Sequence, residues 1–165
     1  MPLTIGIDRV DRHGLQACMT DDGFWRTKSL RALSADEWEA LCDGCGKCCL
    51  VKLQDEDSGE IHYTDAACAL LDAGRCRCTD YPNRAKRVSD CITLTPENID
   101  RVKGWMPSTC AYRLLADGKP LPAWHYLVCG DREAVHRAGA SVRGRTVPEA
   151  GIAEEDLPDH IVDWP

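Results

Sequence analysis

Four cysteines stand within eight positions in the stretch LCDGCGKCCL, residues 41–50. They are Cys42, Cys45, Cys48 and Cys49. Thiolate is a soft ligand that suits zinc, copper(I) and iron-sulfur clusters. Two cysteines spaced C-x-x-C across a tight turn can bind one ion or two corners of a cluster, and Gly44 and Gly46 give the backbone the freedom for such a turn. The triple C-x-x-C-x-x-C run is also found in bacterial ferredoxins, although the C-x-x-x-C-P continuation is missing here.

Further cysteines follow this run at Cys68, Cys76, Cys78, Cys91 and Cys110. One free cysteine is usually a small packing residue, but nine between positions 42 and 110 are not explained by packing. We therefore predict that these nine are metal ligands, enough for one four-cysteine site with spare thiols or for two sites. Neighbouring side chains diverge, so Cys48 and Cys49 are not expected to bind the same ion. Cys18 and Cys129 stand apart and are interpreted as ordinary cysteines.

The spacing bears on which metal is bound. Structural zinc sites normally show two separated C-x-x-C pairs and four ligands. A triple run followed by scattered single cysteines favours an iron-sulfur cluster, of the four-iron four-sulfur type, with zinc as the alternative cofactor. A basic run overlaps the later cysteines and would offset the negative charge of bound thiolates. It consists of Arg75, Arg77, Arg84, Lys86 and Arg87.

Composition limits the classes of partner. The 165-residue chain carries a net charge of −7, which disfavours binding to nucleic acid or to anionic lipid, because both are polyanions. Nucleic-acid contact through the basic run is thus the weaker interpretation, and an unknown protein partner stays open. No secretory signal and no apolar run of about 20 residues is present, so we expect a cytoplasmic protein and no membrane contact. Thiols stay reduced in that compartment, which favours metal over disulfides.

Local signals predict short elements joined by loops. Ser34 and Glu37 form a capping-box pattern that begins a helix leading to Cys42. The stretch 61–64 alternates like a strand, and helices are predicted over 67–72, 95–104 and 108–118 from their capping and glycine signals. The acidic segment 55–60 lacks the spacing of a calcium loop and is predicted to be a solvated turn. We expect a small, irregular, mainly α fold of short helices and loops organised around the cysteine metal or iron-sulfur site.

A chain of this length is expected to form one domain. We assign residues 24–165 to a single cysteine-cluster domain and residues 1–23 to an N-terminal extension. The first 18 residues show no helical or strand period and are interpreted as an extension, and Met19 directly after them is a second candidate start of translation.

The sequence contains no recognisable catalytic motif. The histidines His62, His125, His136 and His160 are each isolated from other ligands in sequence and are interpreted as structural or surface residues, with His125 the main exception to consider. No nucleophile elbow, dinucleotide fingerprint or phosphate loop occurs. Whether the protein is an enzyme stays open at this stage.

Several motifs, in order, resemble a known family. They are CDGCGKCCL (42–50), ACALLD (67–72), RCRCTDY (75–81), DCITLT (90–95), WMPSTCAYRLL (105–115) and LPAWHYL (121–127). The chain from about Phe24 to its C-terminus resembles the YcgN-like cysteine-cluster proteins, a branch of the YkgJ-type CxxCxxCC family, whose members are described as zinc- or iron-chelating domains.

The resemblance implies a small bacterial cytosolic protein that binds a metal or cluster. The cysteines of the wider family resemble Cys42, Cys45, Cys48, Cys49, Cys68, Cys78 and Cys91, while Cys76 and Cys110 look like additions of the YcgN-like branch. Flagellin lysine methylases are similar only through the cysteine cluster. The sequence has no room for extra catalytic machinery of that kind, which leaves methyl transfer in doubt. Residues 1–18 fall outside the resemblance, and members commonly begin near the position of Met19. We therefore hypothesise that Met19 is the native start; an N-terminal peptide of the native protein beginning at Pro2 would refute this.

Three functional hypotheses follow. The first is an iron-sulfur protein for electron transfer, redox sensing or iron handling, in which Cys42, Cys45 and Cys48 act with cysteines downstream. The second is a zinc-stabilised interaction module without chemistry of its own. The third is an enzyme or metallochaperone with an open coordination position, where Cys49 is the exchangeable thiol.

Overall fold

The computed structural model describes residues 23–164. The predicted extension, Cys18 and the candidate start Met19 therefore lie outside the described residues, apart from Gly23. The α-helices are α1 Phe24–Thr27, α2 Ala35–Ala40, α3 Arg84–Arg87, α4 Ile99–Val102, α5 Ala111–Ala116, α6 Tyr126–Cys129 and α7 Ala134–Arg137. The strands are β1 Leu50–Gln54, β2 Ile61–Ala67, β3 Leu71–Asp72, β4 Arg77–Cys78 and β5 Val147–Pro148. Short 3-10 helices span 30–32, 47–49, 81–83, 103–105, 149–151 and 154–160.

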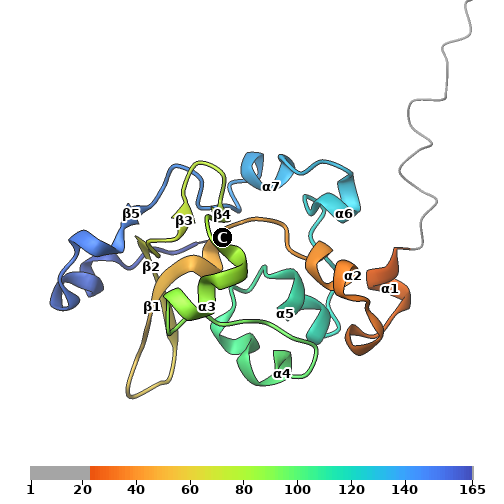
Figure 1. Ribbon diagram of the computed structural model, residues 1–165, viewed down its shortest axis with the longest axis horizontal. Helices are drawn as coiled ribbons and strands as arrows, with labels where there is room; N and C mark the ends of the chain where they lie inside the picture. The colour runs from red at the N-terminus through yellow and green to blue at the C-terminus, as the bar shows by residue number, and fades with distance from the viewer. Residues whose placement is uncertain (1–22, 165) are drawn as a thin grey trace, which may run out of the picture.

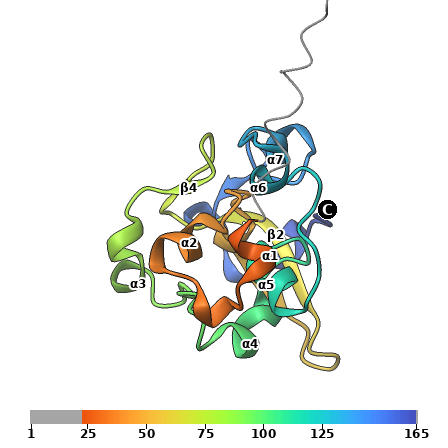
Figure 2. The ribbon, with the colours of Figure 1, turned by 90° about the vertical axis from the view of Figure 1, so that its right-hand side faces the viewer.

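Two sheets make the fold mixed. β1 and β2 pair antiparallel, with Leu50 opposite Ala67, and β5 adds to β2 in parallel, in the order β1-β2-β5. β3 and β4 form a separate antiparallel pair, with Leu71 opposite Cys78. The prediction of a mainly α fold organised around a cysteine metal site is therefore wrong: the fold combines α and β elements around an apolar core. As Figures 1 and 2 show, α1, α2, α4 and α5 gather on one side and the β1-β2-β5 sheet lies on the other.

The helix predicted over 67–72 is the clearest local error. Ala67 ends β2, and the chain then turns so that Leu71 begins β3. The amide of Leu71 donates to the carbonyl of Cys68, and Thr79 donates to Leu70 across the second sheet. Strand pairing with residues distant in sequence has overridden a short helical spacing here. The predicted strand at 61–64 is confirmed within β2, and the acidic turn 55–60 is exposed as predicted.

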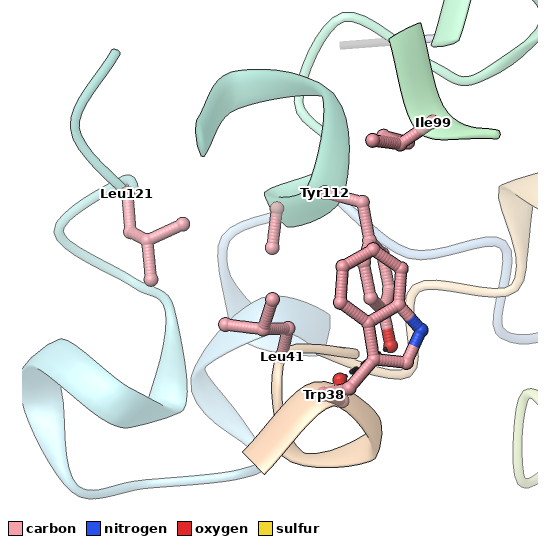
Figure 3. Close-up of a cluster of buried hydrophobic side chains, with 6 residues drawn as sticks. Trp38, Leu41, Ile99, Tyr112 and Leu121 are labelled. Carbon is pink, nitrogen blue, oxygen red and sulfur yellow. Dashed lines mark hydrogen bonds between the residues drawn. The ribbon is translucent and has the colours of Figure 1, made fainter. Parts of the chain in front are cut away.

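The main core forms where α2 crosses α5. Trp38, Leu41, Ile99, Tyr112 and Leu121 pack together with Ala111, and the rings of Trp38 and Tyr112 lie 4.7 Å apart between centroids (Figure 3). The Tyr112 hydroxyl donates to the carbonyl of Trp38 at 2.8 Å. Ring contact and hydrogen bond together fix the distance between the two helices.

The capping box that begins α2 is confirmed. The Ser34 hydroxyl accepts from the amide of Glu37, and the Glu37 carboxylate accepts from the amide of Ser34. Trp38 and Leu41 then face the core, as their spacing predicts. The helices predicted over 95–104 and 108–118 are present but shorter than predicted. A turn over 96–98 delays the start of α4, and Cys110 takes the N-cap position of α5.

A second apolar cluster supports the sheet. It contains Leu50, Ala67, Cys76 and Val142, all buried. The C-terminal segment lies along β2, where the Trp164 indole donates to the Thr64 carbonyl and His160 Nδ1 contacts the Asp65 carboxylate at 2.7 Å. None of the helices within residues 23–164 is long and apolar enough to cross a membrane.

Candidate metal centre

One cavity of about 660 Å³ opens between the β1 end of the sheet, the segment 78–94 and the main core. Five thiols line it, those of Cys48, Cys49, Cys68, Cys78 and Cys91. Buried side chains of the core also line it, among them Trp38, Met106 and Tyr112. The cavity therefore places soft ligands and a water-poor wall in one space.

Four of these thiols, Cys49, Cys68, Cys78 and Cys91, form what we call the cavity group. The Cys68 amide donates to the Cys49 carbonyl at 2.9 Å, which holds the start of β1 beside the end of β2. Cys78 arrives on β4, and the Cys91 amide is held by the Val88 carbonyl. The pKa of the Cys91 thiol is raised by burial and then by negative charge on Cys48, Cys68 and Cys78, although Arg84 opposes the shift. The group is thus close enough to interact electrostatically.

The adjacent pair Cys48 and Cys49 lies at the edge of this space. Their sulfurs are 3.9 Å apart. A hydrogen bond from the Cys49 thiol lowers the pKa of Cys48 to about 7, and the same contact raises the pKa of Cys49. Cys48 is therefore the thiol most readily deprotonated at neutral pH in this pair.

A second set of thiols does not line the cavity. We call Cys42, Cys45 and Cys110 the loop group. Burial raises the pKa of Cys110 to about 11, and charges on Cys48 and Asp43 add to the shift. Part of Cys42 is open to solvent, yet loss of hydration at its sulfur raises its pKa to about 12, with contributions from Cys48, Asp43 and Cys110. None of the three lines the cavity.

Gly44 and Gly46 shape the turn that carries the loop group. Their φ angles are +77° and +78°, in the left-handed region that favours glycine, so the freedom expected of them is used. Gly46 also has no room for a side chain, because a Cβ there would lie 2.7 Å from Val142. The turn is tied to the body by the Val142 amide, which donates to the Cys45 carbonyl.

Asp43 and Lys47 are functional candidates that the sequence reasoning missed. Asp43 Oδ1 accepts from the Cys45 amide at 2.9 Å, while its Oδ2 is buried without a hydrogen-bond partner. The Lys47 side chain is fully buried, and its ammonium donates to the Thr109 hydroxyl at 3.3 Å. Both stand between the cysteines of CDGCGKCC, and this position between candidate ligands was the only signal that the sequence offered.

Cys76 and Cys129 lie outside both groups. Cys76 is buried in the second apolar cluster and adopts a φ of +53°. Cys129 is exposed near α6, as expected of an ordinary cysteine. All ten cysteines between residues 23 and 164 are free thiols.

His125, the histidine singled out in the sequence, makes hydrogen bonds to the backbone. His125 is completely buried, with Nδ1 accepting from the Leu127 amide and Nε2 within 3.1 Å of the Leu41 carbonyl. Burial lowers its pKa, so the neutral ring donates from Nε2. Tyr126 donates to the Ala40 carbonyl next to it. Together with Tyr112, these rings satisfy the last carbonyls of α2 immediately before Cys42. His125 is thus structural, although it is positioned to fix the cysteine turn.

Cations accompany the cavity thiols. The Lys52 ammonium donates to the Cys48 carbonyl at 2.8 Å and to that of Leu50 at 3.1 Å. Burial lowers the pKa of Lys52, whereas negative charge on Cys48, Cys49, Cys91 and Cys68 acts to raise it. Arg84 lies over the Tyr81 ring and also lines the cavity. One member of the predicted basic run therefore faces the thiols, while Arg75 and Arg87 pair with aspartates outside.

The thiols are not arranged as a closed shell. Within residues 23–164, no three His, Cys, Asp or Glu side chains are grouped so that they could hold a metal ion in their present orientations. Five thiols nonetheless line one cavity. What the structure provides is a soft donor set around a cavity rather than a preformed coordination polyhedron.

Comparison with known proteins bears directly on this donor set. Residues 41–111 match the family described as "Putative zinc- or iron-chelating domain", CxxCxxCC. The chain is 59% identical over 149 residues to a UPF0260 protein of Parvibaculum lavamentivorans, covering 89% of this chain and 97% of that protein. It is 57% identical over 139 residues to a UPF0260 protein of Pseudomonas putida strain GB-1, covering 84% and 92%.

A third relative extends the same result. It is a UPF0260 protein of Agrobacterium fabrum, 55% identical over 147 residues, covering 89% of this chain and 90% of that protein. No solved structure matches the chain. The CxxCxxCC resemblance seen in the sequence is therefore confirmed, and it supports metal binding in general.

Proposed function

Because the chain belongs to the UPF0260 family and contains its zinc- or iron-chelating CxxCxxCC domain, we propose that it is an iron-sulfur protein. The cavity group Cys49, Cys68, Cys78 and Cys91 would hold a four-iron four-sulfur cluster, and Cys48 stands at the edge of the site. The observation that carries the proposal is the convergence of five thiols, from four separate places in the chain, on one cavity.

The size of the cavity supports a cluster over a single ion. Four sulfurs placed about 2.3 Å from one zinc ion enclose only a small part of a 660 Å³ space. A cluster, with its own sulfides between the thiolates, fills more of it. Trp38 and Met106 add buried apolar lining to the cavity, and an apolar surrounding is a recognised means of tuning such a site.

The residues of this chain have separate tasks in the proposal. The thiols bind iron as thiolates, so loading releases protons. Lys52 and Arg84 offset the negative charge that four thiolates bring. A bound cluster would supply a one-electron redox centre. Because Cys48 is exposed, solvent reaches the edge of the site, which favours redox sensing or iron handling over insulated electron transfer.

A zinc-stabilised module is the second candidate, and the shortness of the elements favours it. α2 and α5, the longest α-helices within residues 23–164, have six residues each, and β3 and β4 have two. Such elements gain little stability alone. A structural zinc ion that cross-links them can contribute about 10 to 16 kcal/mol to folding.

Metal and sulfide analysis of anaerobically purified protein separates the two candidates. We expect iron and acid-labile sulfide in equal amounts, with the visible absorption of an iron-sulfur cluster. A colourless protein that contains zinc and no sulfide would overturn the cluster and establish the zinc module. Cys68→Ser should lose the iron, whereas Cys129→Ser removes a thiol far from the cavity and should retain it.

A further inference from the structure

We propose that Glu149 is a positioning residue of the cavity site: it holds the turn that carries Cys68 and adds one negative charge to the cavity. The inference rests on the proposed function, because Cys68 is a ligand only if the cavity is the metal site. It goes beyond the CxxCxxCC match, which ends at residue 111, and gives a role to the segment that follows α7.

The register of the sheet brings Glu149 beside Cys68. β5 pairs in parallel with the end of β2, and Pro148 lies opposite Ala67. These two residues are the last of their strands, so the next residue is Glu149 after β5 and Cys68 after β2. Strand pairing between distant segments therefore delivers a carboxylate to the turn of a cavity thiol.

The Glu149 carboxylate contacts the backbone of this turn. Its Oε1 accepts from the Ala69 amide at 2.9 Å, a contact between residues 80 positions apart in the sequence. A hydrogen bond from an amide to an ionised carboxylate is stronger than one between neutral groups. Glu149 also lines the cavity together with the five thiols. It thus reaches the site from a segment that supplies no thiol to it.

The other amides of the turn are held by Cys68 itself. The Leu70 amide donates to Cys68 Sγ at 3.5 Å, and the Leu71 amide donates to the Cys68 carbonyl at 2.9 Å. Of the three amides that follow Cys68, only that of Ala69 is held by a residue from outside the turn. Because the sulfur takes part in one of these bonds, the conformation of the turn sets the position of Sγ. Glu149 therefore acts on the thiol through the backbone.

The charge of Glu149 is not balanced by an ion pair. The ion pairs within residues 23–164 join other side chains. Lys52 and Arg84, the cations that line the cavity, donate to backbone carbonyls, and Asp90, the other aspartate or glutamate of the lining, is exposed. The Glu149 carboxylate thus adds its charge to that of the thiolates. Net charge is one determinant of the reduction potential of a cluster, and added negative charge favours the oxidised form.

Titration of the metal-free, reduced full chain with Zn²⁺ tests the positioning role. Glu149→Ala removes the acceptor of the Ala69 amide, and we expect the zinc affinity of the cavity site to fall about tenfold to a hundredfold. Glu149→Gln keeps a side-chain oxygen for that amide and should restore most of the affinity. Glu154→Ala, the matched control, removes an exposed carboxylate from the next 3-10 helix and should bind zinc like the wild type. An equal loss in the alanine and glutamine variants would refute positioning.

Hydrogen exchange of the metal-free protein reports on the contact without any metal. We expect the Ala69 amide to exchange faster in Glu149→Ala than in the wild type, and Glu149→Gln to restore its protection. The Trp38 amide, bonded to the Ser34 carbonyl, should stay protected and shows that the core remains folded. Unchanged exchange at Ala69 in Glu149→Ala would overturn the proposal.

The reduction potential of anaerobically prepared protein tests the charge. Glu149→Gln should raise the potential, because one negative charge leaves the cavity while the turn is kept. A purely structural residue would not shift the potential in a variant that retains its metal. The same potential in Glu149→Gln and in the wild type would contradict the contribution of charge.

Cys68→Ser separates failure of this inference from failure of the proposed site. Unchanged zinc affinity in Cys68→Ser would refute the cavity site, and the role of Glu149 with it. Loss of affinity in Cys68→Ser together with wild-type affinity in Glu149→Ala would refute only the role of Glu149. If the native protein contains zinc and no sulfide, the cluster fails, and the zinc affinities still decide the positioning role.

Discussion

The main core and the cavity region are built in different ways. Around Trp38, large side chains fill the space between α2, α4 and α5, and ring hydroxyls and an imidazole satisfy the carbonyls at the end of α2. Around the cavity, two-residue strands and loops carry thiols that have no closed arrangement of their own. The main core is held by side-chain packing and hydrogen bonds, whereas the cavity region presents thiols that can act as metal ligands.

The difference indicates where stability comes from. The core buries large apolar side chains, so we expect it to hold its shape when the metal is absent. The cavity region carries its thiols on two-residue strands and loops, and bonds to a metal would cross-link these short elements. The loop group lies at the junction, since its turn follows α2 directly. The following predictions test this division.

Removal of metal should have the largest effect and should be confined to the cavity region. Metal bonds of structural zinc are worth on the order of 10 kcal/mol. After chelation, we expect hydrogen exchange to accelerate strongly at the amides of Cys68 and Thr79, whose acceptors lie beside the cavity. The amide of Trp38, bonded to Ser34, should stay protected. Equal loss of protection at Trp38 would mean that the core also depends on metal.

Leu41→Ala should destabilise the core by about 2 to 5 kcal/mol, because the leucine is completely buried and its removal leaves a cavity. Urea unfolding measures the loss, and it should be nearly the same with and without a chelator. Leu53→Ala, a partly exposed position in β1, is the control and should cost much less. If this loss in the free energy of unfolding depended strongly on the chelator, the stability of the core would be coupled to metal binding in the cavity region.

His125→Phe should cost about 1 to 3 kcal/mol, because the Leu41 carbonyl and the Leu127 amide lose a buried partner. The substitution should also change how the free energy of unfolding depends on pH. Burial lowers the folded-state pKa of His125, so the unfolded chain binds the proton more readily, and stability falls as pH drops below about 6.5. Unfolding at about pH 7.5 and about pH 5.5, on either side of that value, should show a smaller loss in the variant. The remaining loss belongs partly to His136, whose pKa burial also lowers. An unchanged slope would contradict this assignment.

Ser34→Ala should have the smallest effect, about 1 kcal/mol, because it removes one half of the capping box of α2. Thermal or urea unfolding detects it. Ser34→Asp keeps an N-cap acceptor and should retain most of the stability. We expect no change in metal content, and a loss of metal would show that the helix start controls the cysteine turn.

Local signals in the sequence were reliable where the cause was local. Ser34 and Glu37 are three residues apart, and their capping box forms as predicted. The positive φ angles of Gly44 and Gly46 likewise follow from the turn that C-x-x-C spacing requires. The strand around residues 61–64 and the exposed acidic turn were also predictable from alternation and turn residues.

Features that depend on distant partners were not predictable. The segment 67–72 reads as a helix until the pairing of Leu71 with Cys78 is known. The nine cysteines could be counted, but their division into two groups depends on how β1, β4 and α5 meet in space. Burial of Asp43 and Lys47 is a tertiary property, because each looks like an ordinary polar residue of a turn in the sequence.

The cavity group has a further consequence for the order of synthesis. All its thiols lie between Cys49 and Cys91, whereas the rings that complete the core and the turn, Tyr112 and His125, come later in the chain. A growing polypeptide therefore exposes every cavity ligand before its core can close. Once residue 91 has left the ribosome, the nascent chain presents the full cavity donor set. We therefore expect that metal can be captured during translation and that the remaining chain folds onto an occupied centre.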